Sequence, residues 1–452
     1  MDIKKNEEYI VDIIDNGFEG EGIAKINNFT VFVKGAIKGE KVKILILKVN
    51  SSYAFAKIIE IITPSKDRCE EDCKSYKRCG GCDLRHIKYK TTLDIKRNMV
   101  QSLVNKTLNN PIEVNSTIGM EKPFNYRNKA QYPIGLDKEG IPVFGVFANR
   151  THEIIPMKNC KIQTKISEEI AQYTLDFIKE HGIKVYDEKR NIGVFRHIIV
   201  KVGMKTNEVM CVFVVNEDKI KNETTLISGL IERFPEIKTV VKNINNKNTN
   251  VILGNRNIVL YGDGYIEDKL GEFTFKISPM SFYQINPVQT EKLYNLAIQK
   301  AELKGNENVF DLYCGIGTIG IFASKYAKQV YGIEIVPEAI EDAKENAKIN
   351  NIQNTEFMVG DVEFALSELI EKRRIVPEVV FVDPPRKGLD NTTIQNLLKV
   401  EPKKIIYISC NPATLVRDLK MLEEKYQVKD ITPVDMFPWT KHVECVSKLS
   451  LK

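Results

Sequence analysis

The chain has 452 residues, of which 43% are hydrophobic and 28% charged, and its formal net charge is +6. At roughly 100 to 200 residues per domain, this predicts a globular protein of two to four domains. No apolar run approaches the ~20 residues that cross a bilayer, and the first ten residues lack the hydrophobic stretch of a signal peptide. We therefore expect a soluble, cytoplasmic protein.

Residues 8–62 contain short runs of alternating or β-branched residues, and glycine-containing turns separate these runs. This pattern predicts a small all-β barrel. Such a domain could be a packing module without a ligand of its own. A neighbouring segment, residues 66–129, holds more lysine and arginine than aspartate and glutamate. A basic segment of this kind is either a solvated charged face or a phosphate contact, and its position beside the barrel favours RNA.

The middle of the chain predicts a mixed α/β domain. Apolar residues over Thr91–Leu108 recur with helical spacing, so we expect an amphipathic helix that packs on another part of the protein. Between residues 126 and 275, strand-like runs such as Val194–Val202 accompany a helix near Ser167–His181. The asparagine-rich stretch Lys242–Asn250 is expected to be a turn or loop.

From Asn308 the sequence alternates strand, glycine-rich turn and helix, which is typical of a doubly wound parallel sheet. The turn that contains Gly315, Gly317 and Gly320 is weak evidence by itself, because many α/β turns carry glycines for packing alone. Two later strands end in Glu334 and Asp383. Because the carboxyl ends of strands form the ligand crevice of such sheets, Gly315, Glu334 and Asp383 should meet there around a cofactor.

Glu334 lies where an acid can accept hydrogen bonds from ribose hydroxyls, which suits a nicotinamide cofactor as well as S-adenosylmethionine. The turn Asp383-Pro-Pro-Arg386 favours S-adenosylmethionine, since a proline-held carboxylate at the crevice is typical of methyltransferases that act on nucleobases. A solvated aspartate in an ordinary turn is the structural alternative. Methylation of an exocyclic amine or of cytosine would use a similar turn.

Cys410 follows the apolar run Lys403–Ser409 and should reach the same crevice. Carbon 6 of uracil is the electrophilic end of a conjugated enone, and a thiolate adds there readily when its pKa is lowered. A small buried cysteine is the alternative, and it is the default for Cys211 and Cys314. Glu444 offers a carboxylate that could remove a proton, although a solvated glutamate on an edge strand fits the local sequence equally well.

Five segments carry a resemblance to a known family, and their order and combination are specific. They are Ser278–Asn286, Asp311–Gly317, Val382–Gly388, Tyr407–Leu415 and His442–Glu444. Over nearly its whole length the chain resembles the RNA uracil-5-methyltransferases, and within them the 23S ribosomal RNA branch with a TRAM domain and a [4Fe-4S] cluster. The resemblance implies that Cys410 is the nucleophile and Glu444 the base. It also implies S-adenosylmethionine contacts, at Gln284, Tyr313, Glu334, Asp383 and, on a looser match, Asp361.

Cys73, Cys79 and Cys82 supply three thiols on one short loop, and Cys160 is the candidate for a fourth ligand. Metal binding or catalysis is more common than disulfide bonding for clustered cysteines in a reducing compartment. Four thiolates suit zinc or an iron-sulfur cluster, and the spacing does not decide between them. The resemblance favours a [4Fe-4S] cluster. Cys69 departs from the pattern, and it could replace Cys73 as a ligand.

These observations predict an α/β protein of three domains. Residues 1–63 form an OB-like, RNA-binding β-barrel of the TRAM type. Residues 64–275 form a mixed α/β domain that carries the iron-sulfur loop, with its helix near 91–108 packed on the C-terminal domain. Residues 276–452 form a Rossmann-like class I methyltransferase domain.

The expected reaction is methylation of uridine at carbon 5. A flipped-out uridine receives Cys410 at carbon 6, carbon 5 takes the methyl group, and Glu444 removes the carbon 5 proton before Cys410 leaves. We expect 23S ribosomal RNA as substrate, with transfer RNA as the alternative, and no obligatory protein partner. The non-enzymatic alternative is an iron-sulfur RNA-binding protein that has lost methyltransferase activity. Nothing in the sequence supports a loss of activity.

Overall fold

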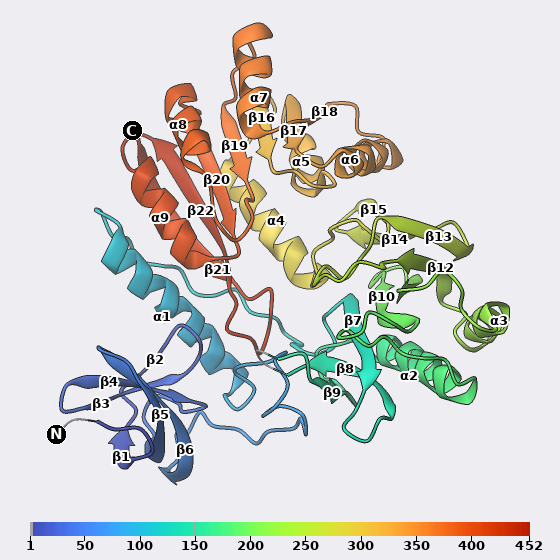
Figure 1. Cartoon of the computed structure of the whole chain (residues 1–452). Coiled ribbons are helices and arrows are strands. Elements are labelled where there is room, and N and C mark those ends of the chain that lie inside the picture. Colours follow the sequence, from blue (N-terminus) through green and yellow to red (C-terminus); the bar gives the residue numbers. More distant parts are fainter. Residues whose placement is uncertain (1–2, 149–150) are drawn as a thin grey trace.

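The structure is a computed structural model that describes residues 3–148 and 151–452. Three bodies are visible in Figure 1: the N-terminal domain at the lower left, a central domain at the lower right and the C-terminal domain above them. Among the described residues, no helix combines the length and the apolar character that a membrane crossing requires.

The N-terminal domain is a six-stranded sheet with the strand order β1-β5-β6-β4-β3-β2. Its strands are β1 (Glu8–Asp12), β2 (Asp15–Asn16), β3 (Gly22–Ile26), β4 (Phe29–Lys34), β5 (Lys41–Val49) and β6 (Tyr53–Thr63). Buried residues alternate with more exposed ones along β4 and β5, as expected when only one face of a sheet is covered. Val31, Val33, Ile44 and Ile46 lie in the core of this domain.

The cysteine-rich segment, residues 64–88, contains neither a helix nor a named strand, and α1 (Tyr89–Thr107) follows it. α1 packs against α9 and β21 of the C-terminal domain. Val100 and Val104 of α1 are fully buried in that domain's core. The helix expected at Thr91–Leu108 thus joins the cysteine-rich segment directly to the C-terminal domain.

The central domain is a seven-stranded sheet with the order β13-β12-β11-β10-β7-β8-β9, and α2 and α3 pack on it. Its elements are β7 (Lys129–Leu136), β8 (Pro142–Phe147), β9 (Ile154–Pro156), α2 (Lys165–Glu180), β10 (Phe195–Val202), β11 (Val209–Val215), α3 (Glu223–Arg233), β12 (Ile237–Ile244) and β13 (Arg256–Tyr261). The asparagine-rich stretch expected to be a loop begins inside β12, because Lys242–Ile244 still pair with β13.

A hairpin of β14 (Ile266–Leu270) and β15 (Phe273–Ile277) leads into the C-terminal domain. The expected boundary at residue 275 falls inside β15, whose Phe275 and Ile277 belong to the same hydrophobic core as the helices that follow. The hairpin pairing continues to Ile277, so the strand itself crosses the expected boundary.

The C-terminal domain is a seven-stranded sheet with the order β18-β17-β16-β19-β20-β22-β21, in which β22 runs antiparallel to its neighbours. Its strands are β16 (Asn308–Leu312), β17 (Gln329–Glu334), β18 (Thr355–Val359), β19 (Val379–Val382), β20 (Lys404–Ser409), β21 (Tyr426–Val434) and β22 (Glu444–Leu451). Its helices are α4 (Pro287–Ala301), α5 (Thr318–Ser324), α6 (Pro337–Ile349), α7 (Val362–Leu366), the π-helix η1 (Ser367–Lys372), α8 (Asn391–Val400) and α9 (Pro412–Leu422).

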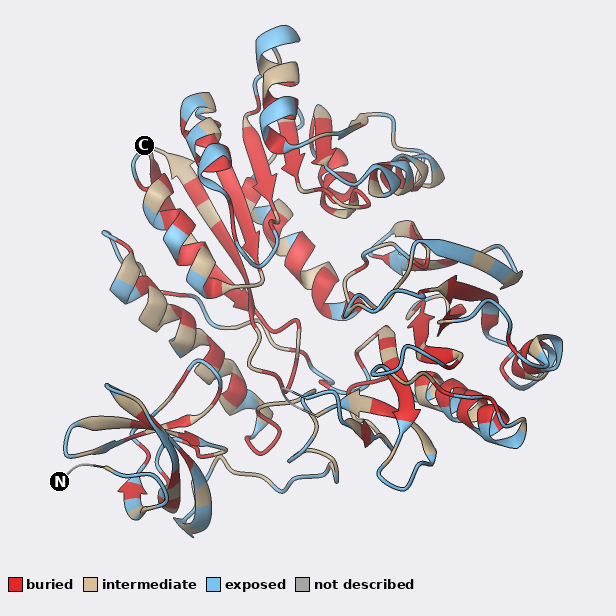
Figure 2. Cartoon of the chain, viewed as in Figure 1, coloured by how far each residue is buried: buried red, intermediate tan, exposed pale blue. Residues whose placement is uncertain are grey.

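Two hydrophobic cores cover the two faces of this sheet, one with α4, α5 and α6 and the other with α1, α8 and α9. The central strands are therefore buried on both faces, as the red arrows in Figure 2 show. This burial explains why β19 reads Val-Val-Phe-Val without a polar residue. The expected doubly wound α/β fold of the C-terminal domain is confirmed.

Candidate active site

The candidate site is built where strands of the C-terminal sheet end. β16, β17, β19 and β20 are parallel, so their carboxyl ends share one edge of the sheet. In Figure 1 this edge points toward the middle of the molecule, where the three bodies meet. Each predicted crevice residue of these strands stands directly at or after a strand end, so the sheet alone brings them together.

The glycine turn after β16 has left-handed backbone at Tyr313 (φ 65°), Gly315 (φ 54°) and Gly317 (φ 79°). Glu334, the last residue of β17, stabilises this turn, because its Oε2 accepts a hydrogen bond from the Gly315 N–H at 3.2 Å. Its Oε1 accepts from the Val336 N–H at 3.0 Å. The carboxylate of Glu334 is therefore oriented by backbone donors on both oxygens.

Two carboxyl groups, the buried Asp311 and the half-buried Asp383, lie behind this turn. The Asp311 Oδ2 accepts from the Gly320 N–H at 2.8 Å. Its Oδ1 has no hydrogen-bond partner among the described residues. Burial, followed by the charges of Asp383 and Glu334, raises the pKa of Asp311 to about 8. Burial alone raises the pKa of Asp383 to about 7. Asp383 thus changes charge near neutral pH.

Gln284 reaches this cluster through Tyr294 of α4. The pKa of the buried Tyr294 hydroxyl is raised by burial and by the charge of Asp383, whereas hydrogen bonds with Thr318 and Gln284 lower it. The Gln284 backbone carbonyl accepts from the Asn128 side chain at 2.9 Å, which ties the segment before α4 to the central domain. No motif in the sequence pointed to Tyr294, because an α-helical tyrosine at a core position is ordinary.

Asp361 and Tyr313 are the two remaining predicted cofactor contacts. The Asp361 Oδ1 accepts from the Phe364 N–H at 2.7 Å and caps α7, which follows β18. The Tyr313 hydroxyl lies 3.4 Å from the Thr393 Oγ1 of α8. Capping alone explains an aspartate at position 361, so the geometry leaves its adenine contact as a prediction.

Cys410 and Glu444 meet at the other side of Asp383. β20 and β22 are antiparallel, with Ser409 opposite Cys445, so the next position along each strand places Cys410 beside Glu444. Cys410 is half-buried, and Glu444 is only 5% exposed. The two groups affect each other's surroundings, since the charge of Glu444 raises the pKa of Cys410.

Both groups hold their protons more tightly than usual. Burial, followed by the charges of Glu444 and Asp383, raises the pKa of the Cys410 thiol to about 11. Burial and the charge of Asp383 raise the pKa of Glu444 to about 8. The direction at Cys410 is opposite to the lowered pKa that a reactive thiolate requires in the sequence analysis. The first cause is burial of the thiol, and the charges of Glu444 and Asp383 add to it more than the charge of Arg386 offsets.

That cation is Arg386, whose charge lowers the pKa of both Cys410 and Glu444. The Arg386 carbonyl accepts from the Asn411 side chain at 3.1 Å, so the turn after β19 is held against the turn after β20. Arg386 belongs to the Asp383-Pro-Pro-Arg386 turn, in which only the carboxylate was predicted to have a role. Its position directly after two prolines next to Asp383 was the available signal.

The cysteines of the second candidate site are half-buried and free. Burial raises the pKa of Cys82 and Cys79, and the charge of Cys160 raises both further. Burial is likewise the first cause at Cys160, where the charge of Cys73 also raises the pKa. Four thiols that act on one another in this way are neighbours in space. Nevertheless, no group of three or more His, Cys, Asp or Glu side chains in the described ranges is placed to hold a metal ion.

Cys69 lies apart from these four thiols. Its Sγ donates to the Arg85 carbonyl at 3.4 Å. Burial raises its pKa, and the charges that modify it come from Arg85, Asp72, Arg68 and Lys88 rather than from another cysteine. The geometry therefore favours Cys73 over Cys69 as the member of the group.

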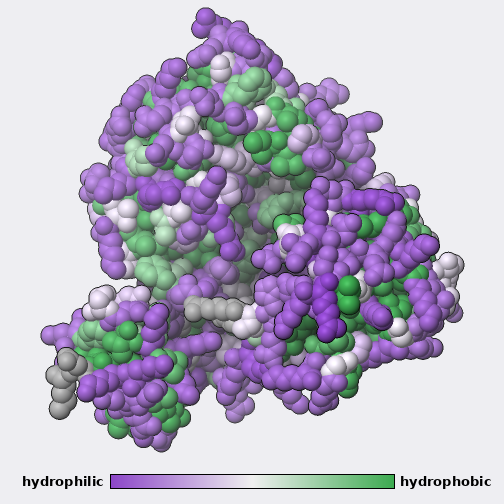
Figure 3. Space-filling model, viewed as in Figure 1, coloured by the Kyte–Doolittle hydropathy of each residue, from purple (hydrophilic) through white to green (hydrophobic). Residues whose placement is uncertain are grey.

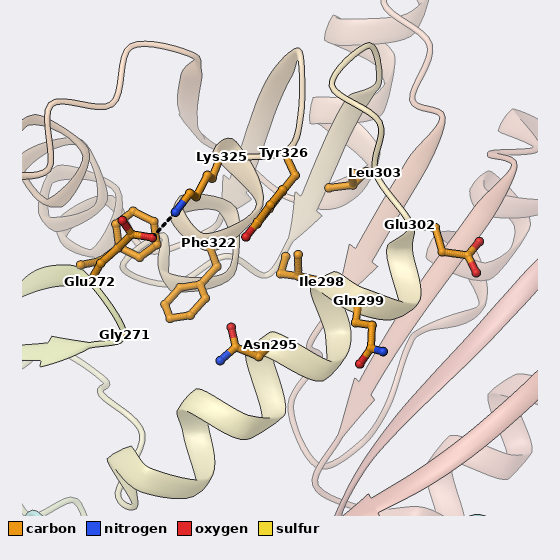
Figure 4. A pocket seen from close by; sticks show the side chains of 11 residues that line it. Gly271, Glu272, Asn295, Ile298, Gln299, Glu302, Leu303, Phe322, Lys325 and Tyr326 are labelled. Carbon is orange, nitrogen blue, oxygen red and sulfur yellow. Dashed lines mark hydrogen bonds and ion pairs between the residues drawn. The ribbon is translucent and has the colours of Figure 1, made fainter.

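A separate cavity of about 340 Å³ lies between α4, α5 and the turn after β14. Figure 4 shows Asn295, Ile298 and Gln299 of α4 on one side, with Phe322 and the Glu272–Lys325 ion pair on the other. None of its lining residues belongs to the strand-end cluster. This cavity is distinct from the candidate active site.

A doubly wound sheet with a glycine turn, an oriented acid after the next strand and carboxyl groups at the strand ends fits the S-adenosylmethionine-dependent methyltransferase class, and the comparisons with known proteins support that class. Residues 245–452 match the family described as tRNA (Uracil-5-)-methyltransferase, and residues 4–59 match the TRAM domain. An RNA methyltransferase of Clostridium acetobutylicum is 50% identical over 98% of this chain and 97% of its own length. One of Staphylococcus aureus is 44% identical over 100% of this chain and 99% of its own.

Among solved structures, the tRNA (uracil-54, C5)-methyltransferase of Pyrococcus abyssi, in complex with S-adenosyl-L-homocysteine, matches with a TM-score of 0.77 and 27% identity. The match covers 98% of this chain and 100% of that one. The chain belongs to the RNA uracil-5-methyltransferase family and is an S-adenosylmethionine-dependent RNA methyltransferase. Its N-terminal domain is a TRAM domain.

Proposed function

We propose that the protein methylates carbon 5 of a uridine through a covalent adduct with Cys410. The observation that carries this proposal is the pairing of a thiol and a buried carboxyl at the ends of β20 and β22, beside the cofactor end of the sheet. Methylation of an exocyclic amine needs no such thiol. The pair therefore favours a carbon nucleophile generated by addition to the ring.

The steps use the side chains as follows. The Cys410 Sγ forms a bond to carbon 6 of a uridine held outside its stack, and the ring electrons move to carbon 5. Carbon 5 takes the methyl group that the sulfonium of S-adenosylmethionine supplies. Glu444 removes the proton that remains on carbon 5, and the Sγ–carbon 6 bond breaks. The products are 5-methyluridine and S-adenosylhomocysteine.

The raised pKa values of Glu444 and Cys410 have different consequences for the proposed reaction. With a pKa of about 8, Glu444 is a stronger base than an exposed carboxylate, which suits proton removal from carbon at near-neutral pH. The Cys410 thiol, with a pKa of about 11, requires a cation to become a thiolate. Arg386 is one such cation, and the sulfonium of the cofactor supplies a second positive charge near Asp383.

Contacts with S-adenosylmethionine are proposed for residues around the glycine turn. Glu334 is oriented toward that turn by its two backbone donors and would accept from the ribose hydroxyls. Asp383 and Gln284 lie together with Tyr294, at the side nearest Cys410. The remaining contacts proposed are those of Tyr313, Gly315 and Asp361.

A [4Fe-4S] cluster held by Cys73, Cys79, Cys82 and Cys160 is the second part of the proposal. Four soft thiolate donors suit iron-sulfur or zinc sites. The charges of neighbouring thiols raise the pKa values of Cys79, Cys82 and Cys160, which supports their closeness in space. Bound metal would remove that repulsion. The cluster would maintain the shape of the basic segment around it for RNA, without a role in electron transfer.

The TRAM domain offers a surface for that RNA. Phe32, Tyr53 and Phe55 stand together on one face of β4 and β6, with ring centroids 5.4 to 5.8 Å apart. Lys34 and Lys57 are paired on the same face and are exposed. Figure 3 shows hydrophobic residues, in green, on the outer surface of this domain. Aromatic rings bordered by lysines are the arrangement that stacks bases of single-stranded RNA.

This surface can be tested with Phe55→Ala, because Phe55 is 41% exposed and contributes little to the core. Stacking is worth about 1–3 kcal/mol per base, so the RNA Kd should rise by about tenfold or more. Ile59→Ala, on the same strand and 45% exposed, is the matched control and should leave the Kd unchanged. If both changes raise the RNA Kd equally, stacking on this aromatic face does not contribute to RNA binding.

For the substrate, we propose 23S ribosomal RNA, on the resemblance of the chain to that branch. Transfer RNA is the second candidate, and a specific observation favours it. The Pyrococcus abyssi structure matches 98% of this chain, and that protein is a transfer RNA (uracil-54, C5)-methyltransferase. A match of this extent includes the TRAM and cysteine-rich regions. The presence of those two regions therefore does not separate the candidates.

The deciding experiment offers the protein unmodified 23S ribosomal RNA and unmodified transfer RNA in parallel, with methyl-labelled S-adenosylmethionine. We expect label in 5-methyluridine of the ribosomal RNA, at a position mapped by nuclease digestion and mass spectrometry. Cys410→Ser is the control and should give none. Label in transfer RNA alone would make transfer RNA the substrate and leave the proposed reaction unchanged. Label on another base would overturn the proposed reaction.

A further inference from the structure

The connection between β21 and β22, residues 435–443, ends at Glu444 and has an unusual environment. It contains no helix or strand, yet most of its residues are buried. Loops of this kind ordinarily run over the surface. Elements from every domain of the chain contact it, so its path depends on residues far away in the sequence.

Trp439 has a strained backbone conformation within this connection. Its φ is 69°, in the left-handed region that a large side chain rarely adopts. Its carbonyl accepts two hydrogen bonds, from the N–H groups of Asp83 and Leu84, both at 2.9 Å. Its indole Nε1 donates to the Pro123 carbonyl at 2.6 Å. Such a conformation persists only where its surroundings hold it.

Residues of the cysteine-rich segment supply most of that support. The Arg85 guanidinium lies 4.9 Å from the centroid of the indole. Cys82 and Cys160 pack against the cluster that Trp439 forms with Tyr126 and its neighbours. Next along the chain, the Lys441 N–H donates to the Asp83 Oδ2 at 3.1 Å. The turn that carries the cysteines therefore holds the half of the connection that adjoins Glu444.

The other half is held by α1 and α4, although Tyr89 of α1 also packs against the Trp439 ring, with centroids 5.2 Å apart. Lys96 and Tyr89 of α1 bind the buried Asp435 carboxylate, at 2.5 and 2.7 Å. Gln289 of α4 donates to the Asp435 carbonyl at 3.1 Å. Disturbing the cysteine-rich turn would therefore release the residues next to Glu444 and leave the start of the connection in place.

We propose that Trp439 is a positioning residue for Glu444, and that the segment Cys82–Arg85 acts on catalysis through it. This inference rests on the proposed role of Glu444 as the base. When Trp439 loses its support, Cys410 can still add to carbon 6 and carbon 5 can still be methylated. Removal of the carbon 5 proton becomes slow, because the carboxylate is displaced. A methylated protein–RNA adduct then accumulates.

The test compares Trp439→Ala, Trp439→Phe and Asp83→Ala with the parent protein in the complete chain. We expect Trp439→Ala to lower kcat by about 10- to 100-fold, as a displacement of about 1 Å can do. The Kd values for S-adenosylmethionine and RNA should stay within about twofold, and a denaturation-resistant, methyl-labelled adduct should appear. Trp439→Phe keeps a ring without the donor and should give a smaller effect. Asp83→Ala removes only the Lys441 contact and serves if Trp439→Ala fails to fold.

Two comparisons make the outcome decisive. Glu444→Gln is measured in parallel: if it accumulates adduct and neither Trp439→Ala nor Asp83→Ala does, the positioning role is overturned while the proposed function stands. If Glu444→Gln accumulates none, the proposed function itself fails. Trp439 is the single tryptophan of the chain, so its fluorescence reports this site alone. Cys82→Ser should shift that emission. An unchanged spectrum would mean that the cysteine turn does not affect the surroundings of Trp439.

Discussion

Cys410 and the group of Cys73, Cys79, Cys82 and Cys160 are all half-buried thiols, but their surroundings differ. Carboxyl groups and one arginine surround Cys410, so its charge depends on Glu444, Asp383 and Arg386. At Cys79, Cys82 and Cys160 burial is the first cause, and the charges that raise the pKa further come mostly from other thiols of the group. Burial raises the thiol pKa in both places. The neighbouring groups determine what can lower that pKa again. A thiol among titrating acids suits proton transfer and catalysis, whereas a set of mutually repelling thiols suits a bound metal.

The largest expected effect is that of Cys410→Ser. A hydroxyl is a far weaker nucleophile toward carbon 6, so methyl transfer should fall by about 10⁴-fold or more. Single-turnover methylation of RNA with labelled S-adenosylmethionine measures it. Cys211→Ala, at a buried cysteine of β11, is the control and should retain the parent rate. Substantial activity of Cys410→Ser would make Cys410 a packing residue and erase the distinction between the two sites.

Glu444→Gln should slow product release by about 10² to 10⁴-fold, the range for loss of a general base. The first methylation should remain, because addition and methyl transfer precede proton removal. Gel electrophoresis under denaturing conditions should therefore show labelled RNA attached to protein. Glu424→Gln, an exposed glutamate after α9, should show no such band. Equal loss of adduct and product would contradict the proposed role of Glu444 as the base.

Cys82→Ser acts on the second site. Losing one of four thiolates should weaken cluster retention, and the RNA Kd should rise by roughly tenfold while the S-adenosylmethionine Kd stays within about twofold. Iron content and the two affinities are measured on the same preparation. Cys69→Ser is the matched control, because Cys69 lies outside the group. A larger loss of S-adenosylmethionine affinity than of RNA affinity would contradict the assigned role.

The smallest effect concerns pH and the charge beside Cys410. Asp383 has a pKa of about 7, so it is neutral at pH 6 and anionic at pH 8. The anion attracts the sulfonium of S-adenosylmethionine and has no such effect on neutral S-adenosylhomocysteine. The ratio of their Kd values should therefore shift toward S-adenosylmethionine between pH 6 and pH 8, by about fivefold if bound cofactor lowers that pKa by one unit. Calorimetry at both pH values tests this, and Asp383→Asn should flatten the response.

Most of the strand-end cluster could be predicted from the sequence, because its members follow apolar runs that can only be buried strands. Gly315, Glu334 and Asp383 are examples, and the geometry of a parallel sheet brings such residues together without further information. Tyr294 and Trp439 could not be predicted in this way. Their roles depend on contacts with other segments, such as Tyr294 with Thr318 and Trp439 with the distant Asp83, and these contacts leave no local periodicity.

The charge state of Cys410 was likewise hidden from the sequence. A cysteine after a strand indicates access to the crevice, but the direction of its pKa shift depends on which charges surround it. Asp383 and Glu444 come from different strands, and their sum exceeds the single contribution of Arg386. Only the three-dimensional arrangement shows that the thiol requires a further positive charge.

The covalent step is tested most directly with RNA in which 5-fluorouridine replaces uridine. Fluorine at carbon 5 cannot leave as a proton, so the adduct should stop after methyl transfer. We expect a denaturation-resistant complex that forms only with S-adenosylmethionine, and mass spectrometry should place the nucleotide on Cys410. Attachment at another residue, or methylation of ordinary RNA with no complex on the fluorinated one, would contradict the account.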